Sequence, residues 1–371
     1  KQLKANFKNF LYSNMTDWNP AEIIGKYPKS LSANLYEEII TNRVWSIQRY
    51  EFGFDDLRNK KLLKFFYGQP YVTVDHSLKS FIPKNLPDYL KKKLLNHYKL
   101  KIINDEALHD KVEFDVVFTV WTQNLDLSLQ SETLLSQKEI YLFSNQLKII
   151  TINALKRLSL DTENFKLLND NRQKILSSNK NDLIKIKELI NSTKKYGTLP
   201  FAHAARACFI SMYLLKNFVK NKYITKKRMD LFLFSIKTVS KELAEDKIKY
   251  KTNNQSLKNL IKKYGHLREG TYEISQNSYE EDPRKYFDTT ERINKEIKSF
   301  TFKNNEKIHI KKYLSDLGSD ISFSSFITYL KKSIELREKI KFEFTKDINE
   351  IFKLIKNLKI FKNISRDDLS F

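Results

Sequence analysis

The chain has 371 residues, and its 41% hydrophobic content is enough to bury one large core or two smaller ones. The low number of turn residues, 7 Gly and 7 Pro, excludes an all-β fold and favours long helices. The formal net charge of +23 is compatible with an anionic partner. However, most basic residues are lysines spread over nearly every segment, which favours a general compositional bias toward lysine.

The N-terminal third of the chain predicts helices with one short strand. Residues 1–12 read as a basic connector and residues 13–30 as an ordered loop with one helical turn. Residues 31–50 have the apolar spacing of an amphipathic helix. A Gly-Gln-Pro turn precedes a short strand at 71–75, and residues 87–103 are expected to be helical.

The next segment is ambiguous between strand and helix. The valines and aromatics of residues 110–122 favour a strand, whereas Asp110 and Glu113 make a capping-box pattern that favours a helix start. We favour the helix. Residues 131–160 and 163–195 are expected to form two helices with polar joints.

The C-terminal half predicts further helices and one long loop. Residues 199–219 form the most apolar helix of the chain, followed by helices within 225–248 and 254–264. Residues 265–290 are too long for a plain connector, and their tyrosines argue against disorder, so this loop is a candidate functional segment. Residues 321–360 form one or two long helices.

These elements predict a mainly α protein with at most a small β element near 71–75. We expect a helical region over 13–360, with subdomains 13–195 and 196–360 as an option. Residues 1–12 would link it to a preceding domain, and 361–371 would begin a connection to a following one. No apolar run reaches the roughly 18 residues that span a bilayer, so we expect no membrane partner.

The cysteine content bears on compartment and metal binding. Cys208 is the single cysteine, which excludes an intramolecular disulfide and a cysteine-based zinc site. A reducing compartment fits this content, and we expect a cytoplasmic protein without a bound metal.

Two polar stretches near the N-terminus are candidate sites. Asp17 and Asn19 precede a helix that starts at Pro20, so they either cap it or help its free amides to hold an anion. Asp75 and His76 are adjacent at the end of the predicted strand, where a carboxylate and an imidazole can do acid–base work. Neighbouring side chains on a strand point to opposite faces, which argues against a direct pair.

The apolar helix at 199–219 carries two polar candidates. His203 and Arg206 are three residues apart and therefore share one face. A buried arginine needs a carboxylate partner or an anionic ligand, and the sequence leaves both open.

The loop after residue 264 carries the candidates for chemistry. His266 can act as a general base on an acceptor hydroxyl, and Arg268 can hold a phosphate bidentately. Tyr264 and Tyr272 flank them as further ligand-binding candidates. The alternative is that both polar groups tie the loop to neighbouring helices.

Known nucleotide-binding and catalytic motifs are absent. The chain contains no G-x-x-x-x-G-K-[ST], G-x-G-x-x-G, G-x-S-x-G or H-E-x-x-H pattern. A complete ATP-dependent enzyme within these residues is therefore not expected.

Several stretches together resemble the family of phosphoenolpyruvate synthase and pyruvate phosphate dikinase, and more distantly rifampicin phosphotransferase. They occur in family order along almost the whole chain. These stretches are DWNPAEIIG (17–25), PKSLSANLY (28–36), GQPYVTVDHSLKSFIP (68–83), HDKVEFDVVFT (109–119), GTLPFAHAARACF (197–209), YGHLREGTYEI (264–274) and ISRDDLSF (364–371).

The resemblance implies the helical, acceptor-binding region of an ATP-dependent phosphotransferase. ATP and magnesium would bind an ATP-grasp domain, and a phosphohistidine domain would relay the phosphate, both outside this chain. The partners implied are those two domains and a small-molecule phosphoryl acceptor. Within this region the resemblance makes His266 and Arg268 the best pocket candidates, with Arg206 helping to neutralise the phosphoryl group and acceptor anion.

Two other functions remain as alternatives. The interpretation as a basic helical nucleic-acid-binding protein is based only on the net charge, and we do not expect nucleic acid as a partner. A structural spacer without a substrate site would set the reach of a swivelling domain.

Overall fold

The chain folds mainly into helices. The computed structural model describes residues 11–14, 16–252, 256–288, 299–358, 361 and 363–371. Its α-helices and strands are β1 (Tyr12–Ser13), α1 (Pro20–Ile23), α2 (Ser30–Tyr36), α3 (Val44–Phe52), β2 (Leu63–Phe66), β3 (Gln69–Thr73), α4 (Val74–Lys79), α5 (Asp88–Asn104), α6 (Leu125–Glu132), α7 (Gln137–Leu176), α8 (Asp182–Ser192), α9 (Leu199–Lys220), α10 (Lys226–Phe234), α11 (Val239–Lys251), α12 (Leu257–Tyr264), α13 (Pro283–Phe287), α14 (Asn304–Leu317) and α15 (Phe323–Asn357). Short π turns are η1 (Glu37–Thr41), η3 (Val112–Val116) and η4 (Thr193–Thr198), and short 3₁₀ turns are η2 (Glu106–Leu108) and η6 (Asp368–Ser370).

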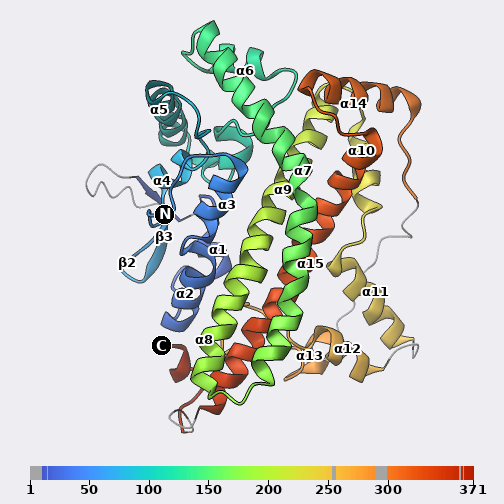
Figure 1. Cartoon of the computed structure of the whole chain (residues 1–371). Helices are drawn as coiled ribbons and strands as arrows, with labels where there is room; N and C mark the ends of the chain where they lie inside the picture. Colours follow the sequence, from blue (N-terminus) through green and yellow to red (C-terminus); the bar gives the residue numbers. More distant parts are fainter. Residues whose placement is uncertain (1–10, 15, 253–255, 289–298, 359–360, 362) are drawn as a thin grey trace.

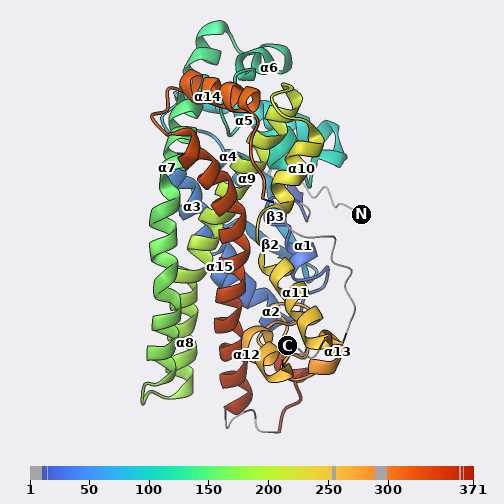
Figure 2. The same ribbon diagram turned by 90° about the vertical axis from the view of Figure 1, so that its right-hand side faces the viewer.

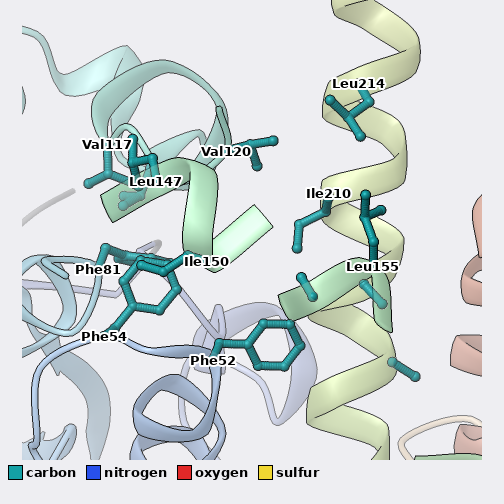
Figure 3. Packing of buried hydrophobic residues seen from close by; sticks show 14 of the residues in the cluster. Phe52, Phe54, Phe81, Val117, Val120, Leu147, Ile150, Leu155, Ile210 and Leu214 are labelled. Atoms are coloured by element: carbon teal, nitrogen blue, oxygen red, sulfur yellow. The ribbon is translucent and has the colours of Figure 1, made fainter. Parts of the chain in front are cut away.

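The core lies where α9 packs against α15, α7 and α3. Figures 1 and 2 show the long helices α7, α9 and α15 running through the molecule, and Figure 1 places α1–α5 on one side of them and α10–α14 on the other. One cluster of buried side chains extends from Leu35 to Phe352, so it spans both the 13–195 and the 196–360 parts. In Figure 3, phenylalanines of the N-terminal part lie beside aliphatic side chains of α7 and α9.

The small β element is a three-stranded antiparallel sheet in the order β1-β3-β2. β3 confirms the strand expected at 71–75; its Val72 pairs with Leu63 of β2, and its Thr73 pairs with Tyr12 of β1. The hairpin loop uses Tyr67 at φ 50° and Gly68 at φ 76°, the positive values that a tight β-hairpin turn needs. β3 ends earlier than expected, because the chain enters α4 at Val74.

The helix expected over 31–50 is interrupted. α2 ends in the π turn η1, and Arg43 then adopts φ 72° before α3 begins at Val44. Residues other than glycine rarely adopt a left-handed conformation, and apolar periodicity carries no signal for one that does. The sequence pattern alone therefore does not reveal this break. The Ile39 carbonyl in η1 accepts a hydrogen bond from Thr198 Oγ1 at 2.5 Å, which links η1 to η4.

The two helices expected over 131–160 and 163–195 are divided differently. α7 runs unbroken from Gln137 to Leu176, because the polar stretch near residue 161 holds no helix breaker and its Asp161 is buried. Its start has a capping box between Ser136 and Glu139. Thus α8 is a separate, shorter helix that continues through η4 into α9.

The remaining expectations are met in part. α5, α9, α12 and α15 lie where helices were expected, whereas the 225–248 segment divides into α10 and α11. Residues 110–122 form only the turn η3 followed by extended chain, and the 265–290 loop contains α13. Residues 1–10, most of the N-terminal connector, lie outside the described residues.

In the described part of the chain, no helix is both long and apolar enough to cross a membrane.

Gly197 tests the packing between η4 and α15. A Cβ at Gly197 would lie 2.8 Å from the Cβ of Phe344, so the helices must move apart to admit a methyl group. We expect Gly197→Ala to lower the free energy of unfolding by about 1–3 kcal/mol, measured by urea denaturation. Asn191→Ala, at an exposed position of the preceding helix, is the control and should change it by about 0.5 kcal/mol or less. Equal effects of the two substitutions would contradict this packing.

Candidate functional site

A cavity of about 560 Å³ lies where the α1 region, η3 and α9 meet. Its lining comes from segments far apart in the sequence, with α3 and α15 completing it. We call it the arginine cavity; its lining residues are Asp17, Trp18, Asn19, Glu22, Ile23, Gln48, Arg49, Asp110, Lys111, Val112, Glu113, Phe114, Phe201, Ala202, Ala205, Arg206, Cys208, Phe209, Met212, Arg337 and Lys341.

Two buried arginines share one glutamate in this cavity. Arg206 Nη1 donates to Glu113 Oε2 at 2.6 Å, and Arg49 Nη2 donates to Glu113 Oε1 at 3.3 Å. Both arginine side chains are 2% exposed, whereas that of Glu113 is 20% exposed. Burial lowers the pKa of Arg206, and the Glu113 carboxylate opposes that shift. Glu113 therefore stabilises two cations whose burial is otherwise costly.

Asp17 provides the second carboxylate for Arg49. Its Oδ1 accepts from Arg49 Nη2 at 2.9 Å, and its Oδ2 accepts from Ser77 Oγ at 2.8 Å. Burial raises the pKa of Asp17, and Arg49 acts in the opposite direction. Asp17 and Asn19 have φ values of 56° and 44°, which cost roughly 1–3 kcal/mol each in a residue other than glycine. Such strain is typical of ligand-binding segments.

Several residues that line the cavity carry a buried side-chain hydrogen-bond donor that has no partner among the described residues. These donors are Trp18 Nε1, Gln48 Nε2, Arg49 Nη1 and Arg206 Nε, and the single acceptor in the same condition is Asn19 Oδ1. A buried donor without a partner costs about 1–3 kcal/mol. A ligand rich in acceptor oxygens would remove that cost.

Aromatic rings form the apolar part of the site. The Arg49 guanidinium carbon lies 3.6 Å from the Phe81 ring centroid, a cation–π contact that fixes the plane of the guanidinium. The rings of Phe114 and Phe209 lie 4.0 Å apart, and Phe201 lines the cavity beside Phe209 on α9. The site thus offers charged donors together with an apolar surface.

Two further cations come from α15. Arg337 and Lys341 line the cavity, are exposed, and form no ion pair with any described residue. Their charge is therefore available to attract an anion to the cavity.

Three of the residues predicted from the sequence meet in the arginine cavity: Asp17, Asn19 and Arg206. Asn19 occupies the N-cap position of α1, but its side chain makes no capping hydrogen bond and donates instead to Glu22. Of the two partners that the sequence left open for Arg206, the structure supplies the carboxylate of Glu113, and Arg206 also lines a cavity.

His203 lies one turn before Arg206 but does not line the cavity. Its Nδ1 is 2.9 Å from Asp161 Oδ1, and its Nε2 is 3.0 Å from Glu51 Oε2. Arg157 pairs with the same two carboxylates. This network joins α3, α7 and α9, so it holds in place the two helices that carry the cavity arginines.

Asp75 and His76 lie outside the cavity. They are in the first turn of α4 rather than at a strand end, which corrects the sequence expectation. Asp75 pairs with Lys99 and accepts from the Leu11 amide at 3.0 Å, while His76 Nδ1 lies 2.7 Å from the Lys61 carbonyl oxygen. These contacts tie the sheet to neighbouring segments.

His266 and Arg268 tie their loop to α15 and do not line the arginine cavity. His266 Nε2 donates to the Phe342 carbonyl at 3.0 Å, and burial lowers the pKa of His266 to about 3. Arg268 donates to Asn349 Oδ1 and, at 3.3 Å, to the Gln276 carbonyl. This geometry matches the structural alternative that the sequence left open.

The two tyrosines of this loop are separated. Tyr264 is buried and donates its hydroxyl to Asp246 Oδ2 at 2.8 Å. Tyr272 lines a smaller cavity of about 350 Å³, which shares Glu22 and Ile23 with the arginine cavity. Of the loop candidates, only Tyr272 therefore lies near the main site.

Sequence reasoning missed Arg49, Gln48 and Glu113 as site residues. A signal for the first two was present, because Trp45, Gln48, Arg49 and Phe52 follow the i, i+3, i+4, i+7 spacing of a buried helix face. Two polar residues on such a face indicate a buried polar site. Glu113 was assigned to helix capping, which hid its role.

No protein-family model matches the chain, and no curated protein or solved structure matches it significantly. Among the described residues, no group of three or more His, Cys, Asp or Glu side chains is arranged to hold a metal ion. The fold and the cavity define a mainly helical protein whose internal site suits an oxyanion attached to an apolar body.

The buried His266 generates a pH-dependent prediction. Its pKa is about 3 in the folded chain and near 6.5 when unfolded, so only the unfolded chain takes up this proton between those values. This contribution to stability is present above pH 6.5 and is lost as the pH falls toward 3. We expect the free energy of unfolding, measured in urea between pH 7 and 4, to fall less in His266→Gln than in the wild type. Parallel pH profiles would contradict the burial of a neutral imidazole.

Proposed function

We propose that this chain binds a small phosphoryl acceptor carrying an oxyanion in the arginine cavity. It would act as the acceptor-binding region of an ATP-dependent phosphotransferase that relays phosphate through a phosphohistidine domain outside these residues. The observation that carries the proposal is the pair of buried arginines, Arg49 and Arg206, each with an unpartnered donor nitrogen in a residue that lines the cavity.

The cavity is built largely from the stretches on which the resemblance to phosphoenolpyruvate synthase rests. The stretches 17–25, 109–119 and 197–209 carry much of that resemblance, and all three contribute lining residues. The stretch 68–83 contacts two residues of the same site: Ser77 donates a hydrogen bond to Asp17, and the Phe81 ring packs against the Arg49 guanidinium.

Each part of the cavity has a role in this proposal. Arg49 and Arg206 hold the oxyanion of the acceptor, and the aromatic rings pack against its apolar body. Arg337 and Lys341 attract the anion and face the charge of the incoming phosphoryl group. Compared with the expectation from sequence, Arg206 keeps its role, and Arg49 replaces Arg268 as the second guanidinium.

Native mass spectrometry tests ligand binding directly. The chain is incubated with the small metabolites of a cell extract, and we expect the wild type to retain one small anion. Arg206→Lys keeps the charge but loses the planar fork, so we expect at least about tenfold lower retention. His266→Ala, in the loop that ties to α15, should retain the anion as the wild type does. Loss in His266→Ala with retention in Arg206→Lys would move the site to the loop.

Two lysines on α15 distinguish attraction of the anion to the cavity from the effect of the overall positive charge. Lys341 lines the cavity, whereas Lys332 is equally exposed on the same helix and does not. Lys341→Ala should weaken retention of the same anion, and Lys332→Ala should not. Absence of any retained species in the wild type would favour the structural-spacer alternative.

The proposed division of labour also predicts that this chain alone does not turn over ATP. The sequence contains no glycine-rich phosphate-binding loop of the known types. In a phosphate-release assay with ATP and magnesium, we expect no activity above that of heat-denatured chain. Turnover by the purified chain would contradict the assignment of ATP binding to a domain outside it.

A further inference from the structure

Glu113 occupies the place between the two guanidiniums where an external anion would be held best. One of its carboxylate oxygens accepts from Arg49 and the other from Arg206, as the two oxygens of a bound ligand would. Its side chain is 20% exposed, ten times the exposure of either arginine. Glu113 is therefore the member of this cluster that a molecule in the cavity can reach.

Asp17 differs from Glu113 in this respect. Its side chain is 3% exposed, and its second oxygen is held by Ser77. Asp17 is thus a permanent partner of Arg49, whereas both oxygens of Glu113 are used on the two arginines alone within the described chain.

The backbone that carries Glu113 is short and irregular. Glu113 lies in η3, which is one isolated π turn flanked by the non-helical residues Lys111 and Val117. π turns are rare and are often found at functional sites. A change in this turn would not disrupt a longer helix.

We infer that Glu113 is a stand-in for the oxyanion of the ligand. When the ligand binds, its carboxylate or phosphate takes the place between Arg49 and Arg206, and Glu113 leaves that place. Arg49 Nη1 and Arg206 Nε are buried without a partner while Glu113 is in place, and its departure opens these donors to the incoming group. This inference rests on the proposed function and deepens it, because it defines the ligand as a carboxylate or phosphate with an apolar body that packs against Phe201 and Phe209.

If Glu113 competes with the ligand, its substitution changes affinity in the opposite direction to the substitution of a residue that binds the ligand. Loss of the Glu113 charge should strengthen anion binding, because the ligand no longer displaces a carboxylate. If Glu113 instead held the ligand, the same change would weaken binding. Asp110 is the matched control, since it is an exposed carboxylate that lines the same cavity but has no contact with either arginine.

Isothermal titration calorimetry at low salt and pH 7 compares the wild type, Glu113→Gln and Asp110→Asn. The probes are inorganic phosphate and benzoate, which carry the two candidate oxyanions. We expect Glu113→Gln to bind at least one probe about tenfold more tightly than the wild type, a free-energy coupling of typical size. Asp110→Asn should gain much less. The probe with the larger gain identifies the oxyanion as phosphate or carboxylate.

Three outcomes would count against these assignments. Equal or weaker binding by Glu113→Gln would overturn the stand-in role while leaving the proposed site intact. Equal gains in Glu113→Gln and Asp110→Asn would overturn it as well, since general electrostatics would then explain both. Failure of all three proteins to bind either probe at millimolar concentration would overturn the proposed function itself.

A second variant keeps the inference testable if Glu113→Gln does not fold. Glu113→Asp preserves the charge, but its side chain is one methylene shorter and reaches the two guanidiniums less well, so anion binding should still be tighter than in the wild type. Thermal unfolding gives an independent readout. Because Arg206 then lacks a well-placed carboxylate while Arg49 keeps Asp17, the variants should unfold at lower temperature, and the tighter-binding probe should raise their Tm more than that of the wild type. Equal rises in Tm would contradict the inference.

Discussion

The buried positive charge of Arg49 and Arg206 sets the arrangement of the N-terminal half of the structure. Two guanidiniums removed from water must be neutralised by carboxylates in good geometry, or their burial costs several kilocalories per mole. Arg49 comes from α3 and Arg206 from α9, while the carboxylates come from the loop before α1 and from η3. Four segments must therefore converge on one point, and the cavity lies at that point.

The rest of the fold supports this convergence. α7, α9 and α15 form an apolar framework, and the cluster around His203 joins α3 to α7 and α9 beside the cavity. The contact with His203 also lowers the pKa of Glu51, which favours the ionised carboxylate in this network. The buried network therefore positions the two arginines without itself contacting the ligand space.

The helical class, the strand at 71–75 and helices such as α9 could be predicted, because apolar periodicity and residue propensity act locally. The break at Arg43 and the continuous α7 were missed, because a left-handed residue leaves no mark in the apolar periodicity and the polar residues near 161 resemble a joint although they do not break a helix. For the site, Arg206 was predictable as a charge in an apolar helix. Arg49 and Glu113 were missed because their meaning comes from pairing across about sixty residues of sequence. His266 was singled out by its loop, and the structure gives it a contact with α15 instead.

The π turn η4 has a consequence for how α9 can change. α8, η4 and α9 form one continuous helical stretch, and a π turn holds one residue more than a regular turn. Each residue of an α-helix advances the side-chain direction by about 100°, so η4 sets the angular phase of everything that follows it. Deletion of a single residue within Thr193–Thr198 would rotate the whole of α9 and carry Arg206 and His203 away from their partners together. Length at this turn is therefore constrained more strictly than the identity of its exposed side chains.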